Sequence, residues 1–203
     1  MKLFYVAGYC SLAAHIVLRE AELSFQLVPV DLASGKTGDG RDYVQINPKG
    51  YVPALELDDG KVITEVAAIV QYLADLKPES RLVPLTGSFE RTQLKEWLNF
   101  IAAELHKSMG QLFHPQISGD WLQSTHAQLH KRLDFVSSCL KHSTFLMGDV
   151  MTVADIYLFV VLGWAKEAKF DLSPWPLLAH YIERIGLRPA VRAALQAEGL
   201  SAA

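Results

Sequence analysis

The sequence predicts a two-domain protein, in which an α/β domain is followed by an all-helical domain. Up to about residue 75, runs of β-type residues alternate with helical patterns, and beyond residue 88 strand signals almost disappear. A stretch rich in Pro, Gly and Ser separates the two parts. The chain has 203 residues, which is enough for two cores. We therefore place a first domain at 1–77, a linker at 78–87 and a helical domain at 88–203.

The first domain begins with a β-α-β pattern. Short runs of β-type residues at Lys2–Val6 and Phe25–Val30 flank a helical pattern at Leu12–Glu22. Two strands joined through a helix are expected to pair in parallel. Three glycines mark Ser34–Arg41 as a surface loop.

A hairpin and a helix complete this domain. Two apolar runs, Pro53–Leu57 and Lys61–Ile63, are separated by Asp58-Asp59-Gly60, and Asp-Gly between such runs predicts a hairpin. Helical periodicity then returns over Glu65–Asp75.

The second domain reads as a bundle of helices. Ser88 is placed to cap the first of them, and the Thr152-x-x-Asp155 spacing predicts a capping box at a later one. The predicted helices are Phe89–Gly110, Trp121–Leu140, Thr152–Trp164, Pro176–Ile185 and Pro189–Glu198.

Composition narrows the class of protein. A formal charge of −3, from 22 acidic and 19 basic side chains, argues against nucleic-acid binding, which depends on a basic face. The N-terminal residues lack a signal-peptide pattern, and no long apolar run predicts a membrane span. Cys10 and Cys139 are the only cysteines, which suggests a reducing compartment. We expect a cytoplasmic protein with no membrane partner.

Cys10 is the most informative residue of the first domain. It follows a predicted strand and a Gly8 turn, and it precedes the first predicted helix. Backbone N–H groups and the dipole at a helix start favour an anion, so a thiolate is expected there. The alternative is a small buried residue that happens to be cysteine.

Several motifs resemble those of a known family. They are Tyr9-Cys10-Ser11-Leu12, Asn47–Leu55, Leu57–Gly60, Thr64-Glu65, Ala68–Asp75, Glu96–Ala102, Glu104–Lys107 and Thr152–Phe159. In their order and spacing they resemble the cytosolic glutathione transferases, and within them the bacterial beta class of these detoxification enzymes. The resemblance implies a thioredoxin-like first domain, a helical second domain, a homodimer, and a glutathione site in the cleft between the domains.

The resemblance also implies the residues of the site. It gives Cys10, His106 and Ser11 as the catalytic residues. The residues it implies for glutathione binding are Cys10, Lys36, Val52, Pro53, Glu65, Val66, Asn99, Ala103, Glu104, His106 and Lys107. Among these, Asn99, Ala103 and His106 are spaced by four and three, so they are expected to share a helix face.

The chemistry of glutathione fits four of these positions. Pro53 is expected to hold the backbone of Val52 outward, so that the tripeptide pairs with it as an added strand would. Glu65 opens a helix, where residue 66 can receive the γ-glutamyl carboxylate and Glu65 can pair with the ammonium group. Without the resemblance, a strand-leading proline and a first-turn acid would be the ordinary interpretations.

Two positions depart from the family pattern. Val66 stands where the beta class usually has Ser or Gly, so we expect weaker γ-glutamyl binding. Gly35 stands where the family commonly has a lysine that meets the glycine carboxylate. Lys36 is the candidate replacement, although a solvated lysine is an equal alternative.

Other candidates have structural interpretations. His126 and His130 have i, i+4 spacing, but the Glu of a metalloprotease motif is absent, so we predict no metal site. Trp164, Phe170 and Trp175 are candidates for an electrophile pocket, with core packing as the alternative.

The leading functional prediction is conjugation of glutathione to small hydrophobic electrophiles, with glutathione as co-substrate and no other cofactor. A second hypothesis is a glutathione-dependent thiol-disulfide oxidoreductase acting through a Cys10 mixed disulfide. A third is a binding protein that holds apolar ligands without turning them over.

Overall fold

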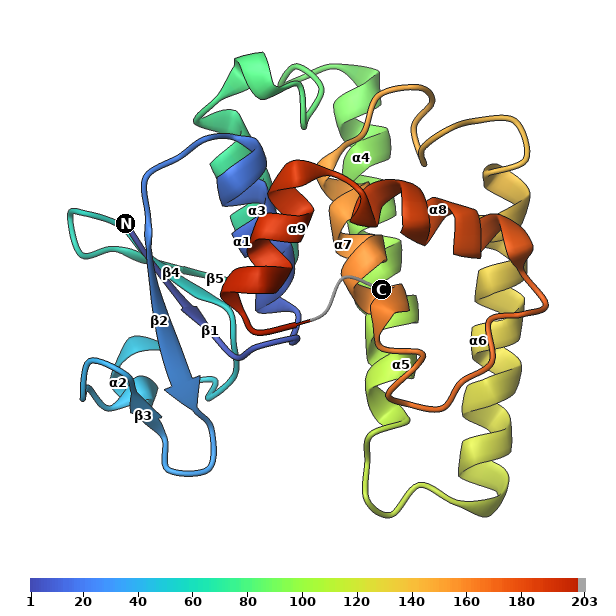
Figure 1. The fold of residues 1–203 in the computed structure, drawn as a ribbon, viewed down its shortest axis with the longest axis horizontal. Coiled ribbons are helices and arrows are strands. Elements are labelled where there is room, and N and C mark those ends of the chain that lie inside the picture. Colours follow the sequence, from blue (N-terminus) through green and yellow to red (C-terminus); the bar gives the residue numbers. More distant parts are fainter. Residues whose placement is uncertain (201–203) are drawn as a thin grey trace. The chain divides into compact units, whose positions relative to one another are not determined.

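A computed structural model describes residues 1–200 of the chain and divides it into two compact units. The first unit contains Met1–Val83 and the chain from Gly186 onward, and the second contains Pro84–Ile185. The first unit is an α/β structure and the second is helical, as predicted (Figure 1).

The first unit contains all of the strands among the described residues. Its strands are β1 (Lys2–Tyr5), β2 (Gln26–Asp31), β3 (Lys36–Thr37), β4 (Ala54–Glu56) and β5 (Val62–Thr64). Its helices are α1 (Ser11–Glu20), α2 (Tyr43–Ile46), α3 (Val66–Asp75), the short 3-10 helix η1 (Pro78–Ser80) and α9 (Pro189–Ala197).

The strands form one mixed sheet in the order β3-β2-β1-β4-β5. β1 pairs in parallel with β2, placing Leu3 opposite Leu27, and antiparallel with β4, placing Leu3 opposite Leu55. The predicted β-α-β unit and hairpin are therefore confirmed. The predicted loop at Ser34–Arg41 contains β3, because Val30 and Asp31 pair with Thr37 and Lys36. This mixed sheet with its helices is a thioredoxin-like fold.

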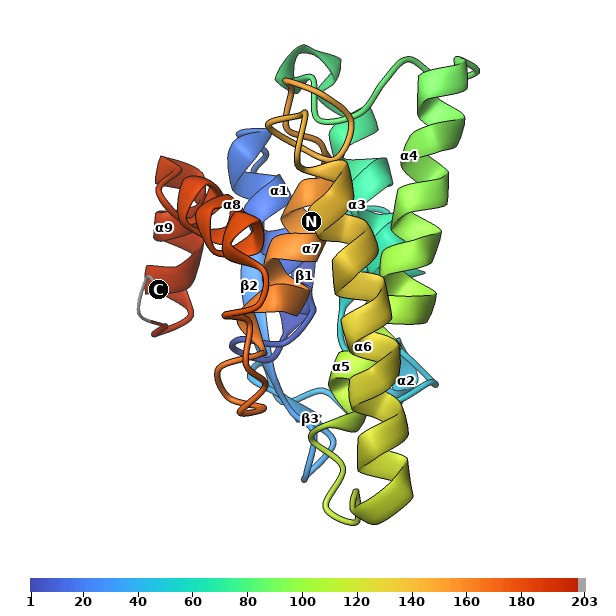
Figure 2. The same cartoon turned by 90° about the vertical axis from the view of Figure 1, so that its right-hand side faces the viewer.

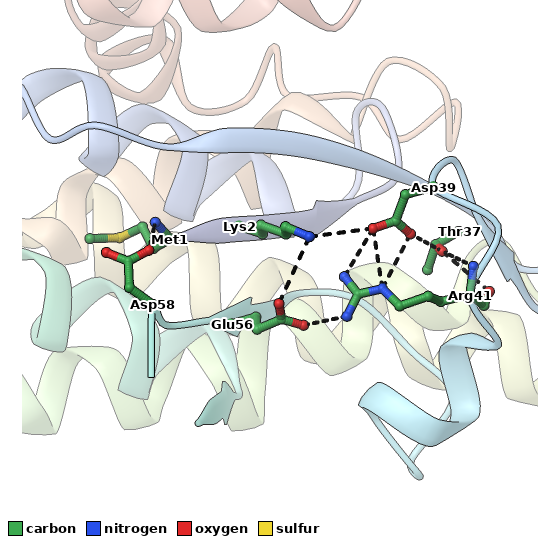
Figure 3. Close-up of polar contacts among 7 residues, drawn as sticks. All are labelled: Met1, Lys2, Thr37, Asp39, Arg41, Glu56 and Asp58. Atoms are coloured by element: carbon green, nitrogen blue, oxygen red, sulfur yellow. Dashed lines mark hydrogen bonds and ion pairs between the residues drawn. The ribbon is translucent and has the colours of Figure 1, made fainter. Parts of the chain in front are cut away.

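Charged side chains tie the sheet to the loop after β3 (Figure 3). Arg41 Nη1 donates to Glu56 Oε2 at 2.6 Å, and Lys2 Nζ lies 3.6 Å from Asp39 Oδ2. The Thr37 hydroxyl donates to Asp39 at 2.5 Å and, together with Arg41, lowers the pKa of that carboxyl to about 2. Alternating cations and carboxylates thereby tie the loop to Lys2 of β1 and Glu56 of β4.

The end of the chain packs on the first helix of the same unit. α9 lies beside α1 (Figure 1), and Arg188 forms a two-pronged ion pair with Glu20 at 2.6 and 2.7 Å. The compact units thus differ from the predicted boundaries at one end, since residues from 186 onward group with the first unit. The boundaries at 1–77, 78–87 and 88–203 stay a prediction.

The second unit is built on a long helical rod. The rod consists of α4 (Phe89–Phe100), the π-helix η2 (Ile101–His106) and α5 (Lys107–Gln111), and α6 (Gly119–Cys139) runs beside it (Figure 2). The other two helices are α7 (Val153–Gly163) and α8 (Pro176–Gly186). α7 is almost entirely buried, which agrees with its nearly unbroken apolar sequence.

Both predicted helix caps are present in the second unit. The hydroxyl of Ser88 accepts the Arg91 N–H at 3.0 Å, and Thr152 and Asp155 form the capping box of α7. Asp155 also accepts hydrogen bonds from the Leu146 N–H at 2.8 Å and the Tyr181 hydroxyl at 2.9 Å. This carboxylate therefore links three segments of the unit.

Candidate glutathione site

Cys10 lies at the start of α1, as predicted, but its thiol is buried. The residue is only 9% exposed, and its Sγ donates to the Val52 carbonyl at 3.3 Å. Burial raises the pKa of Cys10 to about 12, against the lowering effect of the backbone N–H groups of Cys10 and Ser11. The cost of removing water from a charged sulfur is therefore larger than the stabilisation that the helix start gives it. The buried thiol, the alternative to a thiolate, is the form that the structure favours.

Ser11 presents its backbone, and not its hydroxyl, to the cysteine. The hydroxyl donates to the Val6 carbonyl at 3.1 Å and accepts the Val6 N–H at 3.3 Å, and the residue is fully buried. A hydroxyl has one hydrogen to donate, and here it is committed to Val6. The backbone N–H groups of Cys10 and Ser11 are the donors that act on the Cys10 sulfur and lower its pKa, against the larger effect of burial.

Val52 and Pro53 form a cis-proline turn beside Cys10. Their peptide bond is cis, and Val52 is buried. The preceding carbonyl, of Tyr51, accepts the Tyr43 hydroxyl at 2.9 Å and the Asn47 side-chain amide at 2.6 Å. The residue before the turn is therefore held by two side chains, one from the start of α2 and one from the residue that follows α2.

Glu65 caps the start of α3 in an unusual backbone conformation. Its φ of 74° is in the region that favours glycine, a conformation that costs on the order of 1–3 kcal/mol and often marks functional sites. One carboxylate oxygen accepts hydrogen bonds from Lys49 Nζ and, at 2.7 Å, from the Tyr51 hydroxyl. Sequence reasoning did not assign a role to Lys49 or Tyr51, although both lie in a motif that carried the resemblance.

The two departures from the family pattern lie in defined environments. Val66 is the first residue of α3 and is 5% exposed, so its side chain packs into the core and its N–H has no acceptor within the helix. Gly35 has a φ of 67°, which a lysine would adopt only with strain, although a Cβ there would meet no atom within 4 Å. The adjacent Lys36 is an exposed residue of β3.

Three further predicted residues of the second unit line one groove. Asn99, Ala103 and Glu104 border a cavity of about 600 Å³ between the α4–η2 rod and α6. Glu104 forms an ion pair with Arg132 of α6, at 2.6 Å. The rest of the lining consists of aromatic, charged and amide side chains: Gln93, Glu96, Trp97, Phe100, Lys131 and Phe135.

His106 is not among the residues that line the groove beside Asn99 and Ala103. Its ring contacts Tyr157 of α7 and Trp164. Ile101–His106 is a π-helix, which turns less per residue than an α-helix, so α-helical spacing does not hold across it and the common face stays a prediction. Lys107, the next residue, is exposed on α5.

The candidate electrophile-pocket aromatics separate into two places. Phe170 and Trp175 are buried and stack on each other at 6.2 Å, with the His130 ring packed edge-on against both. Core packing is therefore the role that the structure gives these two residues. Trp164 lies apart from them, with its ring centroid 4.9 Å from that of His106.

Two kinds of feature, a group of metal ligands and a membrane-spanning helix, are absent from the described residues. Among residues 1–200, no group of three or more His, Cys, Asp and Glu side chains is placed to hold a metal ion. Over the same residues, none of the helices combines the length and the apolar character that a membrane crossing requires.

A thioredoxin-like unit with a cis-proline turn beside a helix-start cysteine, in a chain that continues into a helical unit, defines the class of two-domain thioredoxin-like proteins. The family models for the glutathione S-transferase N-terminal and C-terminal domains match residues 9–76 and 100–189. The chain belongs to the glutathione S-transferases, and its structural neighbours include members of the bacterial beta class.

Three relatives illustrate the similarity. Glutathione S-transferase GstA of Escherichia coli O157:H7 is 47% identical, over 98% of this chain and 100% of the relative. The solved ternary complex of BphK, a bacterial GST, is 56% identical with a TM-score of 0.97, and the match covers 98% and 100% of the two chains. A sphingomonad glutathione S-transferase solved with glutathione is 43% identical with a TM-score of 0.95, over 99% and 100% of the chains.

Proposed function

We propose that this protein conjugates glutathione to small hydrophobic electrophiles. The observation that carries the proposal is the contact of the Val52 backbone with Cys10 at the start of α1, in a chain that matches glutathione transferases over nearly its whole length. In this proposal, the backbone of Val52 pairs with the tripeptide, and the first N–H groups of α3 receive the γ-glutamyl carboxylate. Glu65 receives the ammonium group through the carboxylate that Lys49 and Tyr51 already contact.

The reaction requires only a thiolate and a held electrophile. The thiol of glutathione gives up its proton, its sulfur attacks the electrophilic carbon, and the leaving group departs with the bonding electron pair. The N–H groups at the start of α1 stabilise the negative sulfur, and His106 assists at the same atom. Positioning both reactants supplies the larger part of the rate increase.

Five further residues are proposed to bind glutathione. Lys36 and Lys107 bind its carboxylates. Asn99, Ala103 and Glu104 contact its γ-glutamyl part.

The burial of Cys10 favours conjugation over the oxidoreductase alternative. Attack on a disulfide requires a thiolate, and a pKa of about 12 leaves little of it at neutral pH.

The two activities can be separated by assaying wild type and the Cys10→Ala and His106→Ala variants with glutathione and an activated aryl chloride. Conjugation predicts a glutathione-dependent thioether product that survives Cys10→Ala and falls in His106→Ala. His114→Ala is the matched control, because its ring contacts Trp121 in another part of the second unit.

Other results would contradict the proposal. Stoichiometric uptake of the aryl chloride without product would support the binding-protein hypothesis. Reduction of a small mixed disulfide that is abolished by Cys10→Ala, in the absence of thioether product, would support the oxidoreductase. Intact mass after incubation with oxidised glutathione, with and without dithiothreitol, tests directly whether Cys10 forms an adduct.

We also infer that the protein is a cytoplasmic homodimer. The groove lined by Trp97, Phe100 and Phe135 supports this inference, because exposed aromatic patches rimmed by polar residues commonly mark protein interfaces. Phe135 is 49% exposed there. Light scattering should give twice the chain mass for wild type and a lower mass for Phe135→Glu, whereas a monomeric wild type would refute the inference.

A further inference from the structure

The end of the π-helix gives His106 a specific hydrogen-bond partner. Nδ1 of His106 lies 2.5 Å from the hydroxyl oxygen of Tyr157, which is a residue of α7. The two rings are nearly perpendicular, at 86°, and the Trp164 ring packs edge-on against the same imidazole at 73°. The imidazole is therefore held by two aromatic rings and by one hydrogen bond to a ring nitrogen.

The partner residue is itself held firmly. Tyr157 is 2% exposed and lies two residues after Asp155, which forms a capping box with Thr152. Asp155 accepts hydrogen bonds from two further segments, through the Leu146 N–H and the Tyr181 hydroxyl. The hydroxyl of Tyr157 is thus presented from a fixed helix start, which is what an orienting group requires.

The acidity of the two groups favours one direction for this hydrogen bond. The contact itself fits either ring tautomer, but a phenolic O–H is more acidic than the N–H of a neutral imidazole and is the better donor of the two. A neutral imidazole has one nitrogen that accepts and one that carries hydrogen. If the phenol donates to Nδ1, then Nε2 carries the hydrogen.

We propose that Tyr157 is a positioning residue, whose hydroxyl donates to Nδ1 of His106 and so holds the ring in the tautomer with hydrogen on Nε2. The inference rests on the proposed function, in which His106 acts at the glutathione sulfur. It specifies that action: His106 donates a hydrogen bond from Nε2 to the thiolate, and the thiol proton leaves to solvent. His106 then serves as a donor to the anion, and not as its base.

The tautomer can be measured directly by nitrogen NMR of histidine-labelled protein without glutathione. The inference predicts that Nδ1 of His106 in wild type has the shift of an unprotonated acceptor, and Nε2 that of a protonated nitrogen. In Tyr157→Phe, which keeps the ring but removes the hydroxyl, both shifts should move toward the average of two tautomers. Hydrogen found on Nδ1 of the wild-type ring would overturn the inference, and this result needs no variant to fold.

The second measurement is the ionisation of bound glutathione, followed by thiolate absorbance against pH. Tyr157→Phe should raise the apparent pKa of the bound thiol and lower kcat about tenfold, as expected when one oriented donor is weakened, with the KM for glutathione within about twofold of wild type. Tyr181→Phe is the matched control, since it removes a buried hydroxyl that contacts Asp155 and not His106. An unchanged pH profile in Tyr157→Phe would overturn the inference.

The two measurements separate this inference from the proposed function. If wild type forms no conjugate but its NMR spectrum shows the Nε2–H tautomer, the proposed function fails and the orienting contact stands. If wild type conjugates and the ring carries hydrogen on Nδ1, the function stands and the role of Tyr157 fails. The double variant, with both His106→Ala and Tyr157→Phe, should lose no more activity relative to wild type than His106→Ala alone, because Tyr157 acts through His106.

Discussion

His15 and Glu198, which are 183 positions apart in the sequence, share a hydrogen bond of 2.8 Å, and both side chains are fully shielded from solvent. Arg19 Nε donates to the other ring nitrogen of His15 at 2.8 Å, so the hydrogen of the imidazole is on the nitrogen that faces Glu198. The second oxygen of Glu198 accepts the Gly8 N–H at 2.9 Å. Glu198, the residue that follows α9, is therefore bonded both to α1 and to the turn that precedes Cys10.

Replacing Glu198 by Ala should destabilise the first unit by about 3–5 kcal/mol, because buried donors lose their acceptor. Glu198→Gln is the graded control, since an amide oxygen can still accept one of the two hydrogen bonds. Urea unfolding followed by circular dichroism should rank stability as wild type, then Gln, then Ala. Equal midpoints for Ala and wild type would contradict this account of the pair.

The Cys10 thiol should react slowly with iodoacetamide at neutral pH. A pKa of about 12, against an ordinary value of 9.0, leaves about a thousandfold less thiolate. The rate should be measured in Cys139→Ser, so that only Cys10 reacts, and it should keep rising with pH beyond pH 9. A plateau near pH 7 would show that the helix start prevails over burial.

The same pKa shift has a consequence for stability at high pH. The folded pKa of Cys10 lies above the unfolded value, so the contribution to stability is complete below pH 9 and is lost as the pH rises toward 12. Cys10→Ala, which cannot ionise, should lose less stability than wild type over that interval.

Lys49→Met should strengthen glutathione binding by about threefold, as expected for an exposed ion pair. Lys49 hydrogen-bonds to the Glu65 oxygen that the Tyr51 hydroxyl also contacts, and it competes there with the ammonium group of glutathione. Calorimetric titration of wild type and Lys49→Met measures the difference, with Lys61→Met as the control, because Lys61 pairs with Asp59 in the hairpin turn. Weaker binding would mean that Lys49 holds glutathione itself.

Val66→Ser should tighten glutathione binding, since a hydroxyl at the first turn of α3 adds a donor for the γ-glutamyl carboxylate. Because Val66 is 5% exposed, the same change should also cost about 1–2 kcal/mol of stability. Val66→Ala removes a similar volume without adding a hydroxyl, so it separates the two effects. Equal affinities in wild type and Val66→Ser would refute the expectation drawn from this departure.

Asp155→Ala should lower the stability of the second unit by about 3 kcal/mol or more, because the buried carboxylate accepts hydrogen bonds from three residues, Leu146, Thr152 and Tyr181. Burial raises the pKa of this carboxyl, against the lowering effect of its donors. Tyr181→Phe removes one of those donors and should cost less. The comparison is made by thermal unfolding, and an unchanged midpoint for Asp155→Ala would refute the role of the capping box.

The sequence predicted correctly the turns and helix caps that depend only on residues close together in the chain. The Asp59-Gly60 turn produced its hairpin, and Ser88 and Thr152–Asp155 capped their helices, because each depends on residues within a few positions. The family motifs likewise located the cis-proline turn and the start of α3.

The features that were missed depend on residues far apart or on the balance of opposing effects. The π-helix that ends at His106 has no distinct sequence signature, so the sequence predicted a continuous α-helix there. Contact of Lys49 with Glu65 requires the turn and the hairpin that bring them together. The state of Cys10 depends on how completely the fold removes water, which position at a helix start does not reveal.

The attachment of α9 to α1 has a consequence for how the protein is made. A ribosome releases the first 83 residues of the chain long before it reaches Gly186, and until then α1 lacks the helix that covers it and the carboxylate that accepts from His15 and Gly8. Domains usually complete their folding in the order of synthesis. Here the first unit to emerge must wait for α9 and Glu198 to be translated, so it completes its packing only after the whole of the second unit has been synthesised.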